Sequence, residues 1–356
     1  MRKPAMCQKE PNCGRLLWRA ARRCRAARTI AAAGTLAGAG TLAATLLAIA
    51  TAMPAAAGAA PAPAGAAPPA GAAPAARTTP ASTPRPAQAR HTARAAAAGA
   101  VSQWIHISAG EATTCGIRMG NTLWCWGDGT FGELGTGHTT NANLPQQVTK
   151  RTAGWNSIAV GGFHTCATRS DGTLWCWGSN DFGQLGIGNT ISQDLPQQVT
   201  SPAADGWASG TAGYQHTCAA RSDGTLWCWG YNSDGQLGIG SHTSQDLPQQ
   251  VTTPASTGWT SVTAGDFHTC ATRTHAVWCW GLNKSGQLGI GNNSSQGRPR
   301  HVTVPATSGW TLVTSGGDHT CATHTGHTLW CWGGNESGQL GIGDNNDRNL
   351  PQQVTS

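Results

Sequence analysis

Alternating side chains in a segment that occurs five times predict a two-stranded β-hairpin. The fullest copy runs from His164 to Gly178, and Ser-Asp-Gly separates its two β-prone arms. Asp-Gly is a strong hairpin signal because glycine accepts the positive φ of a tight turn. In the second arm, Trp175 and Trp177 share one face and Cys176 points to the other, because side chains alternate along a strand. A sheet with tryptophan on one face and cysteine on the other is expected to be buried on both sides.

The spacing of the cysteines supports this hairpin and predicts that each copy contains a disulfide. Cys166 and Cys176 are centred on Asp171, so a three-residue loop places them opposite each other. In the fourth copy Cys270 and Cys279 are one residue closer, and a two-residue loop again places them opposite. A cross-strand disulfide requires this register, since opposed Cβ atoms lie within bridging distance. Buried free thiols are the alternative. The predicted pairs are Cys115–Cys125, Cys166–Cys176, Cys218–Cys228, Cys270–Cys279 and Cys321–Cys331.

A period of 51–52 residues extends over the second part of the chain and predicts its architecture. A typical period contains a Val/Ile strand, a Gly-x-x-His turn, the hairpin, Gly-Gln-Leu-Gly and a segment such as Leu-Pro-Gln-Gln-Val-Thr. The last segment is expected to be an edge strand, because proline cannot donate a hydrogen bond to a neighbouring strand. Four short strands in each period are typical of a propeller blade. The tryptophans that mark the period are Trp104, Trp155, Trp207, Trp259 and Trp310.

The copies resemble the regulator of chromosome condensation repeat family. The family motif combines Gly-x-x-His-Ser/Thr, a hairpin that ends in Trp-Gly, and Gly-Gln-Leu-Gly, which here match 161–165, 177–178 and 183–186. The resemblance covers 101–356 and implies an all-β fold, a β-propeller built from five such repeats. Family propellers commonly have seven blades, so five copies are a departure. We expect the final segment, 350–355, to complete the first blade and close the ring; an open or oligomeric arrangement is the alternative.

The first hundred residues predict export rather than a folded domain. Residues 1–57 contain a basic stretch, an uncharged Ala/Leu-rich run at 29–50 and small residues at 55–57, which is typical of a cleaved signal peptide. An uncleaved membrane anchor is the alternative. Residues 58–100 are rich in Ala and Pro and predict a disordered linker. Because Cys7, Cys13 and Cys24 would leave with the signal, the secreted or cell-surface product keeps ten cysteines.

The charge of the repeat region differs from that of the whole chain. The net charge is +7, but from Val101 onward there are 10 basic and 15 acidic residues. The basic character therefore belongs to the first hundred residues. An acidic repeat domain lacks the positive surface that nucleic acid requires, so we expect no nucleic-acid partner.

Two short loops in each repeat contain the residues that could bind a partner. One loop separates the glycine and histidine of Gly-x-x-His, and the other follows Trp-Gly. Hairpin topology places both at the same end of the blades, opposite the Ser-Asp-Gly turns. All phenylalanines and tyrosines of the protein lie in these loops: Phe131, Phe163, Phe182, Tyr214, Tyr231 and Phe267. Seven acids also lie there: Glu111, Asp128, Asp181, Asp234, Asp266, Asp318 and Glu336.

Aromatic side chains ringed by acids, on loops held by a rigid scaffold, indicate a recognition surface. The predicted partner is an extracellular protein with a basic or hydroxyl-rich surface, and the six aromatics with Asp181, Asp234 and Asp266 are the candidate contacts. A lectin that binds cell-wall glycans is the second hypothesis, and a hydrolase with carboxylates near the axis is a third. In the structural alternative, the rings fill gaps between blades and the acids are merely solvated.

The sequence predicts no catalytic, cofactor or metal site. It has no nucleophile elbow, no zinc-protease helix and no phosphate loop. The histidines that begin the hairpin arms, such as His164 and His216, are expected to make structural hydrogen bonds, because Thr113 replaces them in the first copy. Cysteines nine or ten residues apart do not have the spacing of a zinc site.

Overall fold

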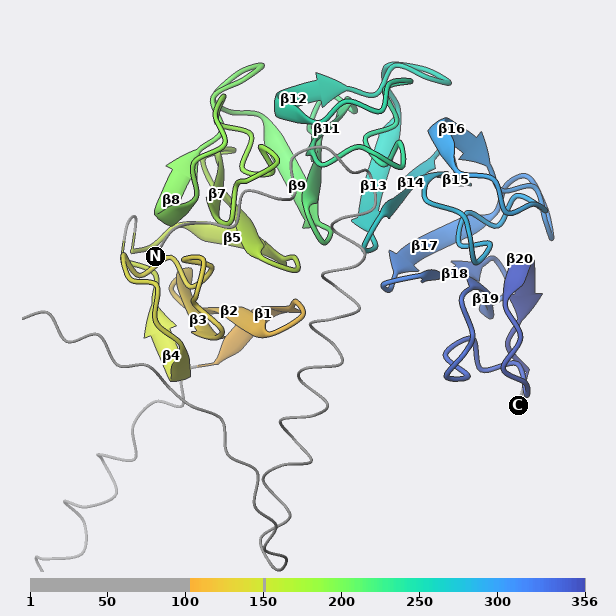
Figure 1. The fold of residues 1–356 in the computed structure, drawn as a ribbon, viewed down its shortest axis with the longest axis horizontal. Coiled ribbons are helices and arrows are strands. Elements are labelled where there is room, and N and C mark those ends of the chain that lie inside the picture. The colour runs from red at the N-terminus through yellow and green to blue at the C-terminus, as the bar shows by residue number, and fades with distance from the viewer. Residues whose placement is uncertain (1–102, 150–151, 356) are drawn as a thin grey trace, which may run out of the picture. The chain divides into compact units, whose positions relative to one another are not determined.

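The computed structural model describes residues 103–149 and 152–355, which form β-strands and no helix (Figure 1). The described residues all belong to one compact unit, Ala100–Ser356. The predicted signal at 1–57 and the predicted linker at 58–100 lie outside them. Within the described ranges there is no helix long and apolar enough to cross a membrane.

The strands form five antiparallel sheets of four strands each, and every sheet uses four consecutive strands. We number the sheets in chain order. The first contains β1 (Trp104–Ala109), β2 (Thr113–Arg118), β3 (Thr122–Gly127) and β4 (Ala142–Gln147); the second β5 (Trp155–Val160), β6 (His164–Arg169), β7 (Leu174–Gly178) and β8 (Gln193–Gln198); the third β9 (Trp207–Ala212), β10 (His216–Arg221), β11 (Leu226–Gly230) and β12 (Gln245–Gln250); the fourth β13 (Trp259–Ala264), β14 (His268–Arg273), β15 (Ala276–Gly281) and β16 (Gln296–His301); and the fifth β17 (Trp310–Ser315), β18 (His319–His324), β19 (Thr328–Gly333) and β20 (Arg348–Gln353).

The two central strands of every sheet form the hairpin that the repeated segment predicts. Cys166 lies opposite Cys176, and the shorter fourth hairpin keeps Cys270 opposite Cys279. The two-residue turn of the fourth hairpin consists of Thr274 at φ 48° and His275 at φ 61°. A type I′ turn requires a positive φ at both of these positions. All five sheets contain a disulfide between these strands, in the pairs expected from the spacing.

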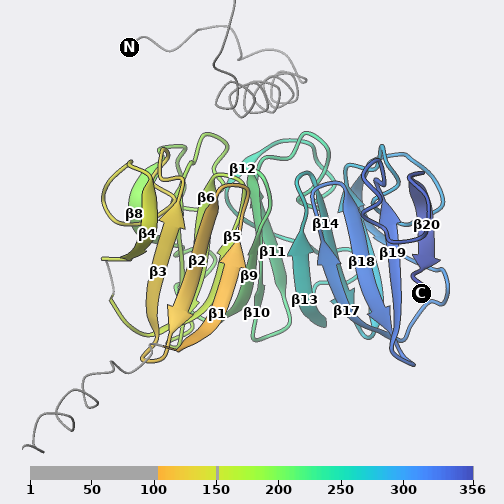
Figure 2. The same cartoon turned by 90° about the horizontal axis from the view of Figure 1, so that it is seen from below.

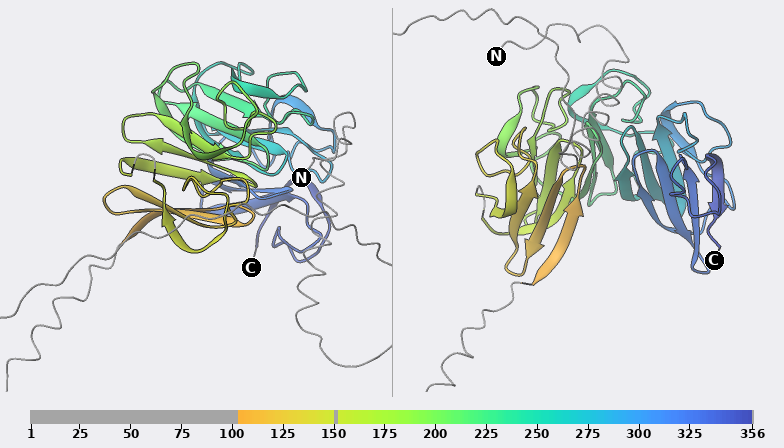
Figure 3. Two further views of the ribbon diagram at one scale, coloured as in Figure 1. Left: turned by 60° about the vertical axis from the view of Figure 1, so that its left-hand side comes forward. Right: turned by 60° about the horizontal axis from the view of Figure 1, so that its bottom comes forward.

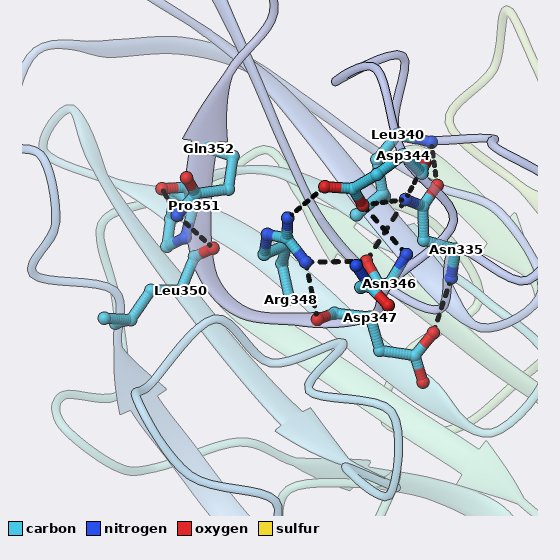
Figure 4. Close-up of polar contacts among 9 residues, drawn as sticks. All are labelled: Asn335, Leu340, Asp344, Asn346, Asp347, Arg348, Leu350, Pro351 and Gln352. Atoms are coloured by element: carbon cyan, nitrogen blue, oxygen red, sulfur yellow. Dashed lines mark hydrogen bonds and ion pairs between the residues drawn. The ribbon is translucent and has the colours of Figure 1, made fainter.

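The sheets follow one another around a common axis, in the manner of propeller blades (Figures 1 and 2). The first strands, β1, β5, β9, β13 and β17, contact one another in succession and are therefore innermost. The fourth strand of each sheet is hydrogen-bonded on one side only, which confirms that the Leu-Pro-Gln-Gln segments are edge strands. In the fifth sheet, Gln352 Nε2 donates to the carbonyls of Leu350 and Pro351 in its own strand, at 3.5 and 3.2 Å (Figure 4).

The expectation that the last segment completes the first sheet is wrong. β20 pairs only with β19, and the first sheet obtains its fourth strand from its own repeat as β4. The fourth-strand position is therefore already occupied. The first sheet (orange to yellow) and the fifth (blue) lie at opposite ends of the series in Figure 1 and in the right-hand view of Figure 3.

The hydrophobic core consists of four clusters, each between two successive sheets. Between the second and third sheets, Cys176 and Leu185 from the second pack against Trp207 and Trp229 from the third. The other three clusters repeat this arrangement. The disulfide face of one sheet is thus covered by the tryptophan face of the next, which confirms the prediction of burial on both sides for the second, third and fourth sheets.

Candidate binding surface at one end of the propeller

The two short loops of each repeat lie at the same end of the sheets. β2 starts at this end and β3 returns to it, so the hairpin turns lie at the opposite end (Figure 2). We call the loops between the first and second strands of each sheet the inner loops: 111–112, 162–163, 214–215, 266–267 and 317–318. The outer loops are 128–131, 179–182, 231–234, 282–285 and 334–337. Together they form what we call the loop end.

The six aromatic side chains of the loop end form one continuous cluster. Each ring contacts the next, with centroids 4.9–6.0 Å apart and mostly edge-to-face geometry, the arrangement that aromatic pairs prefer. The series crosses four sheets. In spatial order the aromatic cluster contains Phe131, Phe163, Tyr214, Phe267, Tyr231 and Phe182.

The rings of the aromatic cluster are only partly buried. Phe131 is 41% exposed, and the other five are half-buried. Their contacts with one another across the sheets fit the gap-filling alternative, whereas their exposed edges leave apolar area for a partner. The structure therefore gathers the six predicted aromatic residues into one surface.

Hydrogen bonds between sheets hold the inner loops in place. The amide of Gly162 donates to the carbonyl of Gly213 at 3.1 Å, and the amide of Tyr214 donates to the carbonyl of Asp266 at 3.3 Å. A Cβ atom on Gly162 would lie 2.7 Å from Tyr214 Cδ2, so only glycine leaves room for this ring. The cluster therefore lies on a backbone that neighbouring sheets fix.

A buried asparagine holds each outer loop of the second to fifth sheets. Asn335 Oδ1 accepts from the amide of Leu340 at 3.0 Å, and its Nδ2 donates to the carbonyls of Asp344 and Asn346 at 2.7 and 3.1 Å (Figure 4). Sequence reasoning treated these loops as variable and missed this residue, although four of the five copies contain it. The equivalents are Asn180, Asn232 and Asn283, and Gly129 takes this place in the first sheet.

The histidines that follow the inner loops connect successive sheets. His164 Nε2 lies 2.8 Å from Thr217 Oγ1 in the next sheet, and Thr217 donates its only hydroxyl proton to the carbonyl of Gln184 at 2.7 Å. His164 must therefore donate from Nε2 and leave Nδ1 without a proton. Equivalent pairs join His216 to Thr269 and His268 to Thr320. Burial lowers the pKa of these three histidines to about 3, so they are neutral at physiological pH.

Acidic side chains lie in the same loops as the aromatic cluster. Asp181 and Glu111 are exposed, and Asp234 and Asp266 are half-buried. Lys284 is the only lysine or arginine in the described loops of this end, so the surface favours a positively charged partner. Within 103–149 and 152–355, no group of three or more His, Cys, Asp or Glu side chains could hold a metal ion.

Glu133 is a buried acid that the sequence analysis did not single out. It takes the place of glutamine in the Gly-Gln-Leu-Gly motif, and its Oε2 accepts from the amide of Phe131 at 2.9 Å. Gln184 makes the same contact with Phe182 in the second sheet. Burial raises the pKa of Glu133 to about 7, and the nearby Asp128 contributes to this rise.

Replacing Glu133→Gln is expected to stabilise the protein above pH 7. Between about pH 4.5 and pH 7 the folded chain retains the Glu133 proton while the unfolded chain loses it, so stability falls as the pH rises through this window. The gain at pH 8 should be about 1–2 kcal/mol. Urea denaturation at pH 5 and pH 8 measures it. The exposed Glu336→Gln is the control, and equal pH dependence of Glu133→Gln and wild type would contradict the assignment.

Solved structures of similar fold support the propeller architecture. Human WBSCR16 matches with a TM-score of 0.64 and 21% identity, covering 72% of this chain and 68% of that one. Yeast RCC1 (Prp20), solved bound to Kap60, matches with a TM-score of 0.63 and 18% identity, covering 72% and 62%. At these identities the likeness shows the fold alone.

Sequence comparison places the chain in a family. The ultraviolet-B receptor UVR8 of Arabidopsis thaliana is 31% identical over 250 residues, which is 70% of this chain and 57% of the receptor. The mitochondrial RCC1 domain-containing protein RUG3 of Arabidopsis thaliana is 30% identical over 258 residues, covering 67% and 56%. The chain thus spans a little over half the length of these relatives. The model of the RCC1 repeat matches residues 121–168, 171–220, 223–272, 275–323 and 327–356, and a second model matches five further overlapping stretches between 104 and 339. The chain therefore belongs to the regulator of chromosome condensation (RCC1) repeat family.

Proposed function

We propose that the loop end of the propeller binds another protein and recognises a positively charged surface on it. The observation that carries this proposal is the continuous aromatic cluster, which brings six half-exposed rings from four sheets into one patch with acids around it. Aromatic side chains bury a large area and anchor many protein interfaces. Acids at the rim attract a basic partner and exclude an acidic one.

The fold supports a binding role rather than a catalytic one. One structure of similar fold contains yeast RCC1 bound to Kap60, so a protein with this fold can bind another protein. The paired cysteines support a location outside the cytosol, because disulfides persist in oxidising compartments. An exported chain would meet its partner in the extracellular space or at the cell surface.

Replacing Phe182→Ala and Tyr231→Ala together is expected to weaken partner binding at least about tenfold, because two anchors of the cluster are lost. The exposed Met119→Ala, at the hairpin end, is the matched control and should bind like wild type. The immobilised full chain captures proteins from culture supernatant, and titration calorimetry then compares the variants against the purified major ligand. Wild-type affinity should fall as the salt concentration rises, since acids contribute to recognition.

Two results would contradict this proposal. If the double variant loses stability but binds its ligand as wild type does, the rings only fill gaps between sheets. If the chain binds sugars on a glycan array with weak affinity at several equivalent sites and captures no protein, the lectin hypothesis holds instead.

A further inference from the structure

The four contacts between successive sheets share one pattern of complementary faces. We call the face with the disulfide the trailing face, and the face with paired tryptophans the leading face. In the second sheet, Leu174 and Val199 on the trailing face are fully buried against Trp207 and Trp229 on the leading face of the third. Clusters of similar composition fill the other three contacts.

Directed hydrogen bonds give each contact a fixed register. The backbone carbonyl of Gln184 accepts from Trp229 Nε1 at 3.0 Å and from Thr217 Oγ1 at 2.7 Å, both in the next sheet. Gly186 lies directly against this indole, and a Cβ atom there would be 2.6 Å from Trp229 Nε1. The carbonyls of residues 133, 236 and 287 accept the same pair of bonds at the other contacts.

The leading face of the first sheet is exposed among the described residues. Trp104 is 42% exposed, whereas its counterparts in the other four sheets are 0–3% exposed. Ile107 is 72% exposed, whereas Val313 at the same position of the fifth sheet is 6% exposed. Trp126 is half-buried, although its counterparts are fully buried. This face therefore presents the apolar side chains that the other sheets bury.

The trailing face of the fifth sheet is exposed in the same way. Leu329 is 40% exposed, whereas its counterparts in the first four sheets are fully buried. Val354 and Cys321 are half-buried, unlike their buried counterparts. A Cβ atom on Gly341 would meet only Val354 within 4 Å, where the equivalent glycines meet a tryptophan of the next sheet. The described part of the chain thus contains both halves of its own repeated contact, unpaired at opposite ends.

We propose that the fifth sheet of one copy of this chain binds the first sheet of a second copy, head to tail. Leu329 would pack against Trp104 and Ile107 of the second copy, as Leu174 packs in the internal contact. The Trp126 indole of the second copy would donate to the carbonyl of Gln339, which is the counterpart of Gln184. A second copy of the chain is the expected partner, because the leading face of its first sheet has tryptophans at the positions that the internal contacts bury.

The proposed contact has a defined symmetry. Because the two faces differ, a dimer retains one free leading face on one copy and one free trailing face on the other, and association continues. The five sheets already occupy most of the turn around their axis (Figure 1), so a second copy must be displaced along that axis. The contact is then less complete than the internal ones, and the assembly is concentration-dependent.

Two single variants on the exposed faces test this contact in the full chain. Ile107→Asp alters the leading face and Leu329→Asp alters the trailing face, at exposed positions where the fold tolerates charge. Sedimentation velocity over a wide range of concentration should show wild type associating. Each variant alone should associate at least about tenfold more weakly. Ile191→Lys, at a residue that is 67% exposed and on neither end face, is the control and should associate like wild type.

Mixing the two variants tests the head-to-tail arrangement itself. Ile107→Asp keeps a normal trailing face and Leu329→Asp keeps a normal leading face, so an equimolar mixture should form one-to-one dimers that grow no further, because the two remaining faces both carry an aspartate. A wild-type chain that stays monomeric at every concentration would overturn the proposal and indicate that its own chain covers these faces. Failure of the mixture to dimerise would also overturn it, whatever the wild type does.

Discussion

Acidification from pH 7 to pH 5 is expected to destabilise the propeller by about 2 kcal/mol for each of three buried histidines. His164, His216 and His268 are neutral in the folded chain, where burial lowers their pKa to about 3 from an ordinary value of 6.5. Below about pH 6.5 the unfolded chain therefore binds protons that the folded chain does not. Stability is lost progressively as the pH falls from about 6.5 towards 3. Urea denaturation between pH 4.5 and pH 7.5, followed by tryptophan fluorescence, measures this slope.

The substitution His216→Thr separates this effect from other acid-sensitive groups. Threonine is tolerated at the same position of the first sheet, where Thr113 Oγ1 donates to the carbonyl of Asp128 at 2.8 Å. The variant should be less stable at pH 7, because Thr269 loses its partner, but its acid slope should be about one third smaller. His242→Thr, at an exposed histidine, should keep the wild-type slope. An unchanged slope in His216→Thr would contradict the assignment. Protonation of Glu133 stabilises the folded chain as the pH falls through part of this range, which opposes the effect of the histidines. The measurement therefore compares the pH slope of each variant with that of wild type.

Reduction of the five disulfides is expected to prevent folding. Each bridge closes a hairpin of about ten residues and stabilises the fold by about 2–3 kcal/mol through the entropy of the unfolded chain. Together they contribute about 10 kcal/mol or more, which equals the whole stability of an ordinary domain. A chain that is reduced and alkylated in denaturant should stay unfolded after dilution, as circular dichroism and tryptophan fluorescence would show.

The environment of the bridges also predicts the order in which they react. Cys218 and Cys228 lie fully buried between sheets, whereas Cys321 in the fifth sheet is half-buried. Under native conditions a reductant should therefore open Cys321–Cys331 first, and mass mapping of alkylated peptides identifies it.

The unreduced chain, taken through the same denaturation, is the control for the refolding experiment. Refolding of the fully alkylated chain to the wild-type spectrum would contradict the prediction.

Local pattern was sufficient to predict the hairpins and the composition of the loop end. The register of Cys166 with Cys176 depends on a turn of three residues and on strand alternation, both of which are local properties. The same topology places the start of β2 and the end of β3 at one end, which predicted that the loop aromatics would lie together. Side chains alternate along a strand, so the neighbours Trp175 and Cys176 predicted that both faces of the sheet would be buried.

Contacts between sheets decided what the sequence pattern left open. The role of His164 depends on Thr217, 53 residues away in the next sheet, and no spacing within one repeat indicates that bond. The expected ring closure was wrong because a fourth strand from the same repeat already occupies the edge of the first sheet. The sequence by itself determined the blade, its disulfide and its loop residues, since each depends on neighbours along the chain. Only the tertiary structure decided that, among the described residues, both end faces are exposed, because packing between sheets sets how far five blades reach around their axis.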